Sequence, residues 1–214
     1  TGHFGQRRNG LMQMRQLPMV LGVFLTAVLS LGWGDNWKEI RKGAGRIQSI
    51  RAEFIQEKHM KILAEPLISK GVFYFRMDDD LRWEYTAPIQ SVLLMYDGNI
   101  RRYILGKDGW IVDETARLQA MQMVLGEITH WLNGRFDENP DFTAALKPDR
   151  TIVLTPKAPS MAAVISRIIL HLSKTPGLME AVTIHEGADS FTRLIFQNAR
   201  LNVPIEDAVF RTVK

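Results

Sequence analysis

The fold is decided by residues 68–88, which read ISKGVFYFRMDDDLRWEYTAP. The segment Leu67–Arg76 is rich in aromatic and β-branched residues and is apolar on both faces of a predicted strand. After three consecutive aspartates, Leu81, Trp83 and Tyr85 alternate with polar residues, which is the pattern of a strand with one buried face. The stretch therefore predicts two strands joined by a solvated hairpin turn.

Similar segments recur along the chain, separated by turn signals such as Asp97-Gly98 and Thr175-Pro176-Gly177. The further predicted strands are Arg51–His59, Ser91–Tyr96, Ile100–Leu105, Trp110–Val112, Phe142–Leu146, Thr151–Leu154, Ser166–Leu172, Leu178–His185 and Phe191–Ala199. Because strands do not alternate with helices in β-α-β units, the sequence predicts a mainly β (α+β) protein with an antiparallel sheet or barrel.

Two amphipathic helices interrupt the strands. The first is marked by Trp37, Ile40, Ala44 and Ile47, which recur at helical spacing. The second, Leu118–Leu132, carries one apolar stripe and is followed by Asn-Gly, a helix stop signal. We expect both helices to bury an apolar face against the sheet.

The N-terminal segment has the pattern of a secretory signal peptide. Arg15 precedes the apolar run Leu17–Gly32, and Gly32 and Gly34 supply the small residues of a cleavage site. We therefore expect residues 1–34 to be a signal peptide with an upstream extension, with Met14 as the start, and residues 35–214 to be the mature domain. The alternative is an uncleaved membrane anchor.

Charge and cysteine content exclude several classes of protein. The formal charge of +4 falls to +1 when Arg7, Arg8 and Arg15 of the N-terminal segment are removed. The remaining basic residues are interspersed with acidic ones, so no nucleic-acid-binding face is predicted. The chain has no cysteine, which excludes disulfides, thiolate metal sites and cysteine nucleophiles.

The motifs of common enzymes and metal sites are missing from the sequence. It contains no glycine-rich phosphate loop, no two-histidine zinc helix and no Gly-x-Ser-x-Gly elbow. Glu127 and His130 have the spacing of half a di-iron site, but no second half exists, so we interpret them as a solvated helix face. We predict no enzymatic activity, no cofactor and no metal.

The apolar content points to a cavity instead. Methionine suits surfaces that accept variable apolar shapes, and seven methionines follow the N-terminal segment. They are Met60, Met77, Met95, Met121, Met123, Met161 and Met179. The alternative is a plain hydrophobic core.

Several motifs, in order, resemble the LolA family of periplasmic carriers of outer-membrane lipoproteins. They are Phe54-Ile-Gln-Glu-Lys58, Gly71-Val-Phe-Tyr-Phe75, Leu81-Arg-Trp-Glu-Tyr85 followed by Pro88, Asp97-Gly98, Val153-Leu-Thr-Pro-Lys157, and Phe196-Gln-Asn198 with Asn202, Pro204-Ile205, Asp207 and Phe210. The resemblance implies an open antiparallel β-barrel with helices covering one side of an apolar cavity for acyl chains. It implies a ligand-binding cavity lined by Phe73, Phe75, Met77, Leu81, Trp83, Leu93, Met95, Met121, Val124 and Leu125.

The resemblance also implies a monomeric periplasmic carrier that receives lipoproteins from an inner-membrane releasing transporter and delivers them to an outer-membrane acceptor. One departure qualifies that role. Family carriers place an arginine and an aromatic residue where this chain has Met77 and Leu81, and Arg76 lies one residue out of phase. The alternatives are therefore a LolA-like carrier or sensor of another envelope lipid or hydrophobic product, and an envelope enzyme acting on lipids.

Overall fold

The computed structural model describes residues 37–77, 79–113, 127–187 and 189–213. The chain divides into two units, residues 1–33 and 34–214, and every described residue belongs to the second. The described strands are β1 (Ser49–His59), β2 (Leu67–Arg76), β3 (Asp80–Ala87), β4 (Ser91–Tyr96), β5 (Asn99–Gly106), β6 (Gly109–Val112), β7 (Phe142–Lys147), β8 (Thr151–Pro156), β9 (Arg167–Leu172), β10 (Met179–Glu186) and β11 (Ser190–Leu201). The described helices are α1 (Trp37–Ala44), helical residues 127–132, α3 (Pro159–Ala162) and α4 (Ala208–Arg211).

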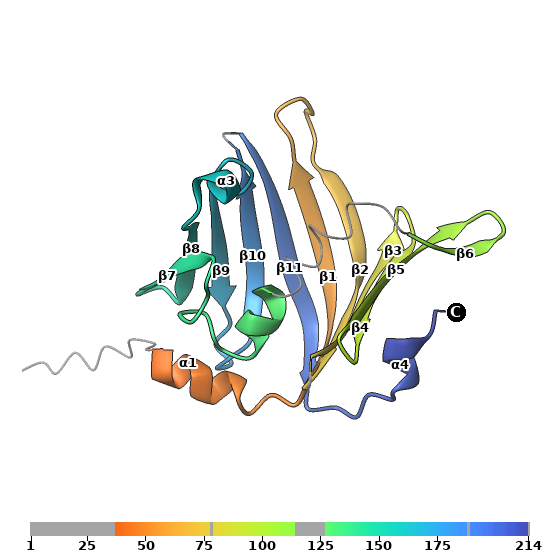
Figure 1. Cartoon of the computed structure of the whole chain (residues 1–214), viewed down its shortest axis with the longest axis horizontal. Coiled ribbons are helices and arrows are strands. Elements are labelled where there is room, and N and C mark those ends of the chain that lie inside the picture. Colours follow the sequence, from red (N-terminus) through yellow and green to blue (C-terminus); the bar gives the residue numbers. More distant parts are fainter. Residues whose placement is uncertain (1–36, 78, 114–126, 188, 214) are drawn as a thin grey trace, which may run out of the picture. The chain divides into compact units, whose positions relative to one another are not determined.

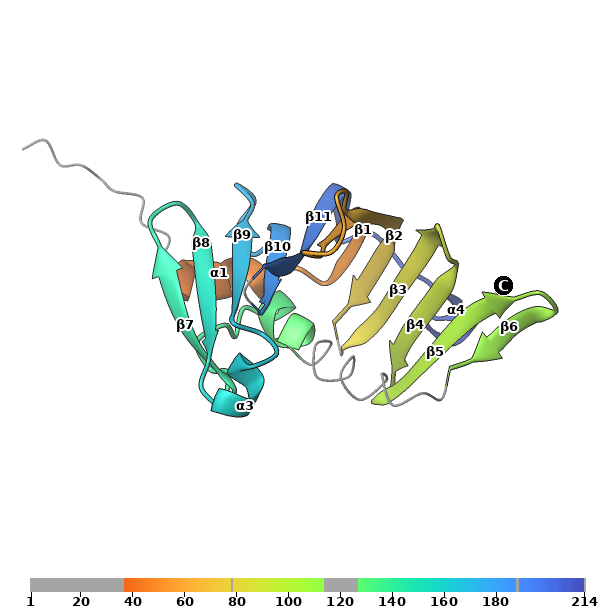
Figure 2. The same cartoon turned by 90° about the horizontal axis from the view of Figure 1, so that it is seen from above.

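All eleven strands form one antiparallel sheet in the order β6-β5-β4-β3-β2-β1-β11-β10-β9-β8-β7. β1 to β6 pair in sequence order, as do β7 to β11, and the pairing of β1 with β11 joins these two halves of the sheet (Figure 1). The edge strands β6 and β7 do not pair with each other, so the sheet stays open. Figure 2 shows it arching over helical residues 127–132. The predicted open antiparallel fold is confirmed.

The core lies on the inner, concave face of the sheet. The register places Ala52, Phe73, Trp83 and Leu93 in one row across β1 to β4, and these side chains are buried. β8, β9 and β10 continue the face with further buried aliphatic residues, among them Ile152, Leu154, Ile168, Leu170 and Val182. The period of two therefore places the core residues on one face of the sheet, although β4 is buried on both faces.

The helix α1 is shorter than its apolar spacing predicts. It ends at Ala44, and Ile47 lies beyond it, although Ile47 is still buried against the core. Gly45 is a poor helix former, and the next two amide groups donate to the carbonyls of Gly43 and Ala44 in tight turns. The prediction that Ile47 belongs to the helix is wrong, although its burial follows the predicted stripe.

The short helix α4, which the sequence does not predict, packs on the outer face of β3 and β4. Phe210 of α4 is fully buried, with the guanidinium carbon of Arg76 4.8 Å from its ring centroid. Arg76 pairs with Asp207 at 2.7 Å, and Arg82 donates to two backbone carbonyls of this segment at 2.7 and 3.0 Å. Arg76 thus faces away from the inner surface, as its phase in the strand predicts.

Candidate functional site

Aromatic rings form the centre of the inner face. Phe54 and Trp83 lie with their ring centroids 4.9 Å apart, and Phe73 meets Trp83 edge-on at 5.3 Å. Phe196 of β11 joins them, 5.9 Å from Phe73 and 6.2 Å from Trp83. Because β11 is the partner of β1, the last strand completes a cluster that the first three begin.

The helical residues 127–132 cover this face. Ile128 and Leu132 are buried, and they line a small apolar cavity between the helix and the sheet. The rest of its lining is Ile50, Ala52, Phe73, Leu178, Met179 and Phe196. The cavity measures about 20 Å³, which is room for about one water molecule. The described residues are therefore closely packed between the helix and the sheet, with little free space between them.

Most of the predicted ligand-binding residues lie together on the inner face. Those that are described and buried in its core are Phe73, Phe75, Leu81, Trp83, Leu93 and Met95. Met77 instead follows the end of β2, half-buried, and its backbone N–H donates to the Gln48 carbonyl at 2.9 Å. Met121, Val124 and Leu125 lie outside the described residues. The role of all ten in binding a ligand stays a prediction.

Two polar pairs on the inner face were not predicted. The Tyr85 hydroxyl donates to Oε1 of Gln56 at 2.7 Å, and burial raises the pKa of Tyr85 to about 12. Arg102 stands opposite Leu93 in the register and pairs with Asp113 at 2.7 Å. The sequence signal for these pairs is a polar residue at a strand position that shares a face with apolar residues. These groups give the otherwise apolar inner face a polar margin.

The prediction that Glu127 belongs to a solvated helix face is wrong. Its side chain is buried, and its carboxylate accepts a hydrogen bond from the Asn139 side-chain amide. Asn139 is also buried, and its Oδ1 accepts from the backbone N–H groups of Asp141 and Phe142. Asn139 therefore ties the helix to the start of β7. Burial raises the pKa of the Glu127 carboxyl, against the Asn139 hydrogen bond, which lowers it.

We expect Glu127→Gln to raise the melting temperature at neutral pH and to leave it unchanged well below pH 4.5. A carboxyl whose pKa is raised by folding stabilises the native state fully below its unfolded pKa of 4.5, and this stability is lost as pH rises through the folded pKa. Glutamine stays neutral and keeps an acceptor for Asn139. Thermal unfolding as a function of pH measures the difference. Glu180→Gln, which removes the same charge from an exposed position, is the control. Equal curves for Glu127→Gln and the parent protein would contradict this account.

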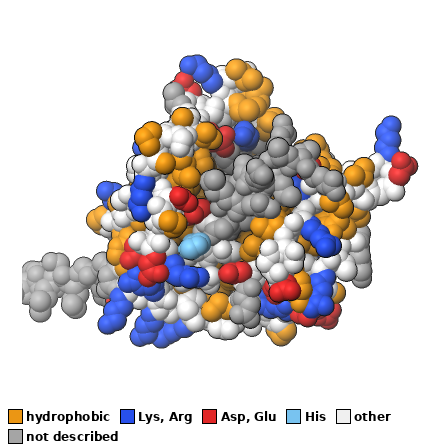
Figure 3. Space-filling model, viewed as in Figure 1, with side chains coloured by type: hydrophobic (Ala, Val, Ile, Leu, Met, Phe, Trp, Pro, Cys, Tyr) orange, Lys and Arg blue, Asp and Glu red, His pale blue; other side chains and the backbone are white. Residues whose placement is uncertain are grey.

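Exposed apolar side chains gather at one end of the sheet, where β1, β3 and β5 finish and α3 lies (Figure 1). They are Ile62, Leu63, Leu67, Ile68, Ile89, Leu105, Ile111, Val112 and Val164. Figure 3 shows hydrophobic side chains on the hairpin at the top of this end. Among the described residues, none of this group lies at the opposite end, beside α1 and α4. This apolar rim is suited to contact with a membrane or a lipid-bearing partner.

The described residues contain no group of three or more acidic, histidine or cysteine side chains that could hold a metal ion. Within the same part of the chain, no helix has the length and hydropathy needed to cross a bilayer.

Comparison with known proteins finds a family model that matches most of the chain. The family model described as outer membrane lipoprotein carrier protein LolA matches residues 45–213. A DUF1329 family protein from Desulfovibrio piger is similar in structure, with 13% identity, a TM-score of 0.44, and 82% of this chain and 97% of that chain covered. A LolA superfamily protein from Nitrosomonas europaea has 11% identity and a TM-score of 0.39, with 82% and 97% covered.

A chain of the MucA/MucB complex from Pseudomonas aeruginosa is also similar, with 16% identity and a TM-score of 0.48. The match covers 81% of this chain and 59% of that chain, so this chain spans somewhat over half of its length. No curated protein sequence matches the chain significantly.

Proposed function

Because this chain belongs to the LolA family, we propose that it is a periplasmic carrier that binds the acyl chains of lipoproteins and transfers them to the outer membrane. The observation that supports this proposal is the apolar inner face, with its aromatic centre and its cover of helical residues 127–132. An open sheet leaves this face reachable from its edges. In this proposal residues 1–34 direct export, residues 35–214 form the carrier domain, and the protein acts as a monomer without catalytic activity.

The small volume of the apolar cavity sets a condition on the mechanism. Since its volume is about 20 Å³, an acyl chain enters by displacing the helix from the sheet. Each buried methylene contributes roughly 0.8 kcal/mol, so a chain of several methylenes offsets the lost contacts of Ile128 and Leu132. The helix then closes over the ligand or returns to the sheet when the ligand leaves. The apolar rim supplies the surface that faces the membrane partners, an inner-membrane releasing transporter and an outer-membrane acceptor.

A second candidate function is carriage or sensing of a different envelope lipid or hydrophobic product. The observation that favours it is the departure at Met77 and Leu81 from the residues of family carriers. Met77 has no side-chain hydrogen-bond donor, and both neighbouring arginines, Arg76 and Arg82, are bound to the C-terminal segment on the outer face. No arginine of β2 or β3 is therefore in place to hold the helix against the sheet by hydrogen bonds. The contact between helix and sheet depends instead on apolar side chains, and such contacts are non-directional.

We expect Leu178→Asp to weaken binding of a synthetic triacylated lipopeptide by about tenfold or more. Leu178 lines the cavity and is half-buried, so the protein accommodates the change, whereas a carboxylate beside an acyl chain is costly to desolvate. The matched control is Ile169→Asp, which alters a half-buried residue on the opposite face of the sheet. Binding is measured by fluorescence titration, and thermal unfolding confirms that both variants fold.

Mass spectrometry of material that co-purifies from the native periplasm then separates the two candidates. Acylated lipoproteins support the first candidate, and another lipid supports the second. If Leu178→Asp and Ile169→Asp weaken lipopeptide binding equally, or neither does, the inner face is not the lipid site.

A further inference from the structure

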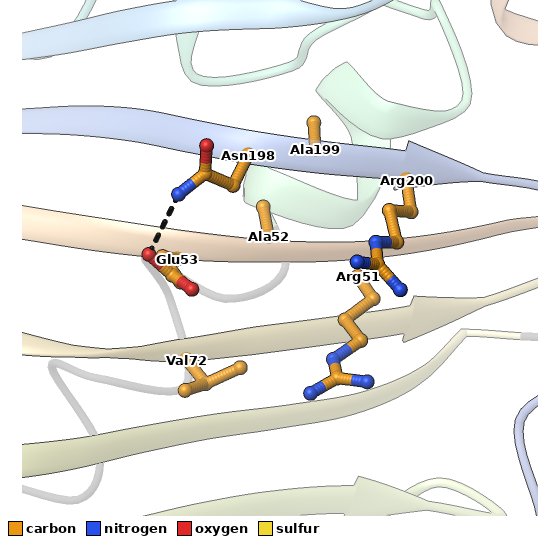
Figure 4. A pocket seen from close by; sticks show the side chains of 7 residues that line it. All are labelled: Arg51, Ala52, Glu53, Val72, Asn198, Ala199 and Arg200. Carbon is orange, nitrogen blue, oxygen red and sulfur yellow. Dashed lines mark hydrogen bonds between the residues drawn. The ribbon is translucent and has the colours of Figure 1, made fainter.

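A hollow of about 440 Å³ lies on the outer face of the sheet, on the other side of β1 and β11 from the apolar cavity. Its lining is Arg51, Ala52, Glu53, Val72, Asn198, Ala199 and Arg200 (Figure 4). Its volume falls in the range of roughly 300–1,000 Å³ that is typical of small-molecule sites. Nothing in the proposed lipid carriage uses this hollow.

The hollow arises from an irregularity in strand pairing. Arg51 pairs with Arg200, but the next pair is Glu53 with Gln197, so β11 has one residue more than β1 at this point. Asn198 takes up the extra residue with a φ of +52°, a left-handed conformation that asparagine tolerates. Ala52, opposite the bulge, turns its side chain to the inner face beside Phe73, so this position adds no side chain to the hollow.

The two arginines give one end of the hollow an unbalanced positive charge. Arg51 and Arg200 stand directly opposite each other, and like charges in that position are destabilising. In the described part of the chain neither guanidinium lies within ion-pair distance of a carboxylate, and the contact found for Arg51 is with the Tyr74 ring, 5.6 Å from its centroid. Figure 4 shows both guanidinium groups on the same side of the hollow.

The other end of the hollow carries the opposite charge. The exposed carboxylate of Glu53 accepts a hydrogen bond from the Asn198 side-chain amide at 2.9 Å, which fixes its position (Figure 4). The hollow thus presents the two guanidinium groups at one end and the fixed carboxylate of Glu53 at the other. A ligand that matches it has a negative group and a positive group in the same small molecule.

We propose that this hollow binds a phosphate group through Arg51 and Arg200, and that Glu53 selects phosphates joined to an amine, as in a phosphoethanolamine head group. A tetrahedral phosphate offers oxygen atoms to two guanidinium forks from different strands, whereas a planar carboxylate is matched by one fork. The bound phosphate relieves the repulsion between the arginines. The site recognises free phosphate and lipid head groups by the same chemistry, and Glu53 distinguishes between them.

The test is calorimetric titration at low salt with three soluble probes: inorganic phosphate, glycerophosphoethanolamine and glycerophosphoglycerol. We expect the double variant Arg51→Gln/Arg200→Gln to weaken binding of all three by at least about tenfold, because charge-assisted hydrogen bonds are lost. The control is Arg46→Gln/Arg193→Gln, which removes two exposed arginines outside the hollow and is expected to bind as the parent protein does. Glu53→Gln is expected to remove the preference for glycerophosphoethanolamine over glycerophosphoglycerol without weakening inorganic phosphate.

Thermal unfolding provides a second measurement that does not depend on detecting heat of binding. Phosphate is expected to raise the melting temperature of the parent protein and not of Arg51→Gln/Arg200→Gln, which is itself expected to be at least as stable without phosphate. Equal loss of binding in both double variants would show diffuse charge attraction and overturn the site. Tight binding of inorganic phosphate with no preference for the ethanolamine probe would overturn the selection by Glu53. None of these outcomes bears on lipopeptide binding at Leu178, so the two proposals can fail separately.

Discussion

Replacing Gly71 by alanine is expected to lower the free energy of unfolding by about 3 kcal/mol or more, or to prevent folding altogether. A Cβ atom at this position would lie 1.9 Å from the Glu84 carbonyl oxygen and 2.5 Å from the nearest ring atom of Phe54. The first contact is with the backbone of the neighbouring strand, and the second is with a fully buried ring, so neither can give way cheaply. Urea unfolding followed by tryptophan fluorescence measures the loss.

The matched control is Gly106→Ala on the β5–β6 hairpin. There the new Cβ would meet the Cδ1 atom of Ile111 at 2.7 Å, which is the end of an exposed and flexible side chain. We expect this variant to lose less than about 1 kcal/mol, as is usual for exposed positions. Equal losses at Gly71 and Gly106 would show that the close contact between β2, β3 and Phe54 does not decide the stability.

Replacing Trp83 by alanine is expected to cost about 3–5 kcal/mol of unfolding free energy, because a large side chain is deleted from a packed core. Trp83 is 6% exposed and contacts the rings of Phe54, Phe73 and Phe196. Denaturant unfolding measures stability, and lipopeptide titration on the same variant measures binding. A small loss of stability with a large loss of binding would show that Trp83 forms the wall of an open cavity.

The conservative variant Trp83→Phe separates ring packing from hydrogen bonding. The indole Nε1 of Trp83 is buried and meets the geometry of a hydrogen bond with none of the described residues, although burial raises the pKa of the nearby Tyr85 hydroxyl and Trp83 lowers it to a smaller degree. Phenylalanine removes this donor and keeps an aromatic ring against Phe54, so we expect a loss of only about 1–2 kcal/mol. A loss of stability as large as that of Trp83→Ala would mean that the indole N–H makes a stabilising hydrogen bond, which phenylalanine cannot make.

Much of the fold could be predicted from sequence because its signals are local. β2 and β4 have the predicted bounds. The other strands begin or end within one or two residues of their predicted bounds. Alternation with a period of two and turn residues such as Asp97-Gly98 act between near neighbours, so they are legible in a single chain. The short helices α3 and α4 escaped prediction because a single turn has too few residues to show a helical period.

The buried state of Glu127 shows where local patterns fail. Its spacing from His130 predicts a shared helix face but does not say which element covers that face. Asn139 and the start of β7 supply the cover, and no periodicity links them to the helix. A charged residue near a helix end is usually solvated, and only the packing reveals that this one is not.

The sequence by itself determined the strands, the parity that turns Phe73, Phe75, Leu81 and Trp83 to one face, and the family resemblance, since each depends on residues close together in the chain. Only the tertiary structure decided that β1 and β11 are partners. That single non-local pairing brings Phe196 to the aromatic cluster and places Arg200 opposite Arg51. Strand order depends on the relative free energies of alternative long-range pairings, and those are set by packing over the whole sheet.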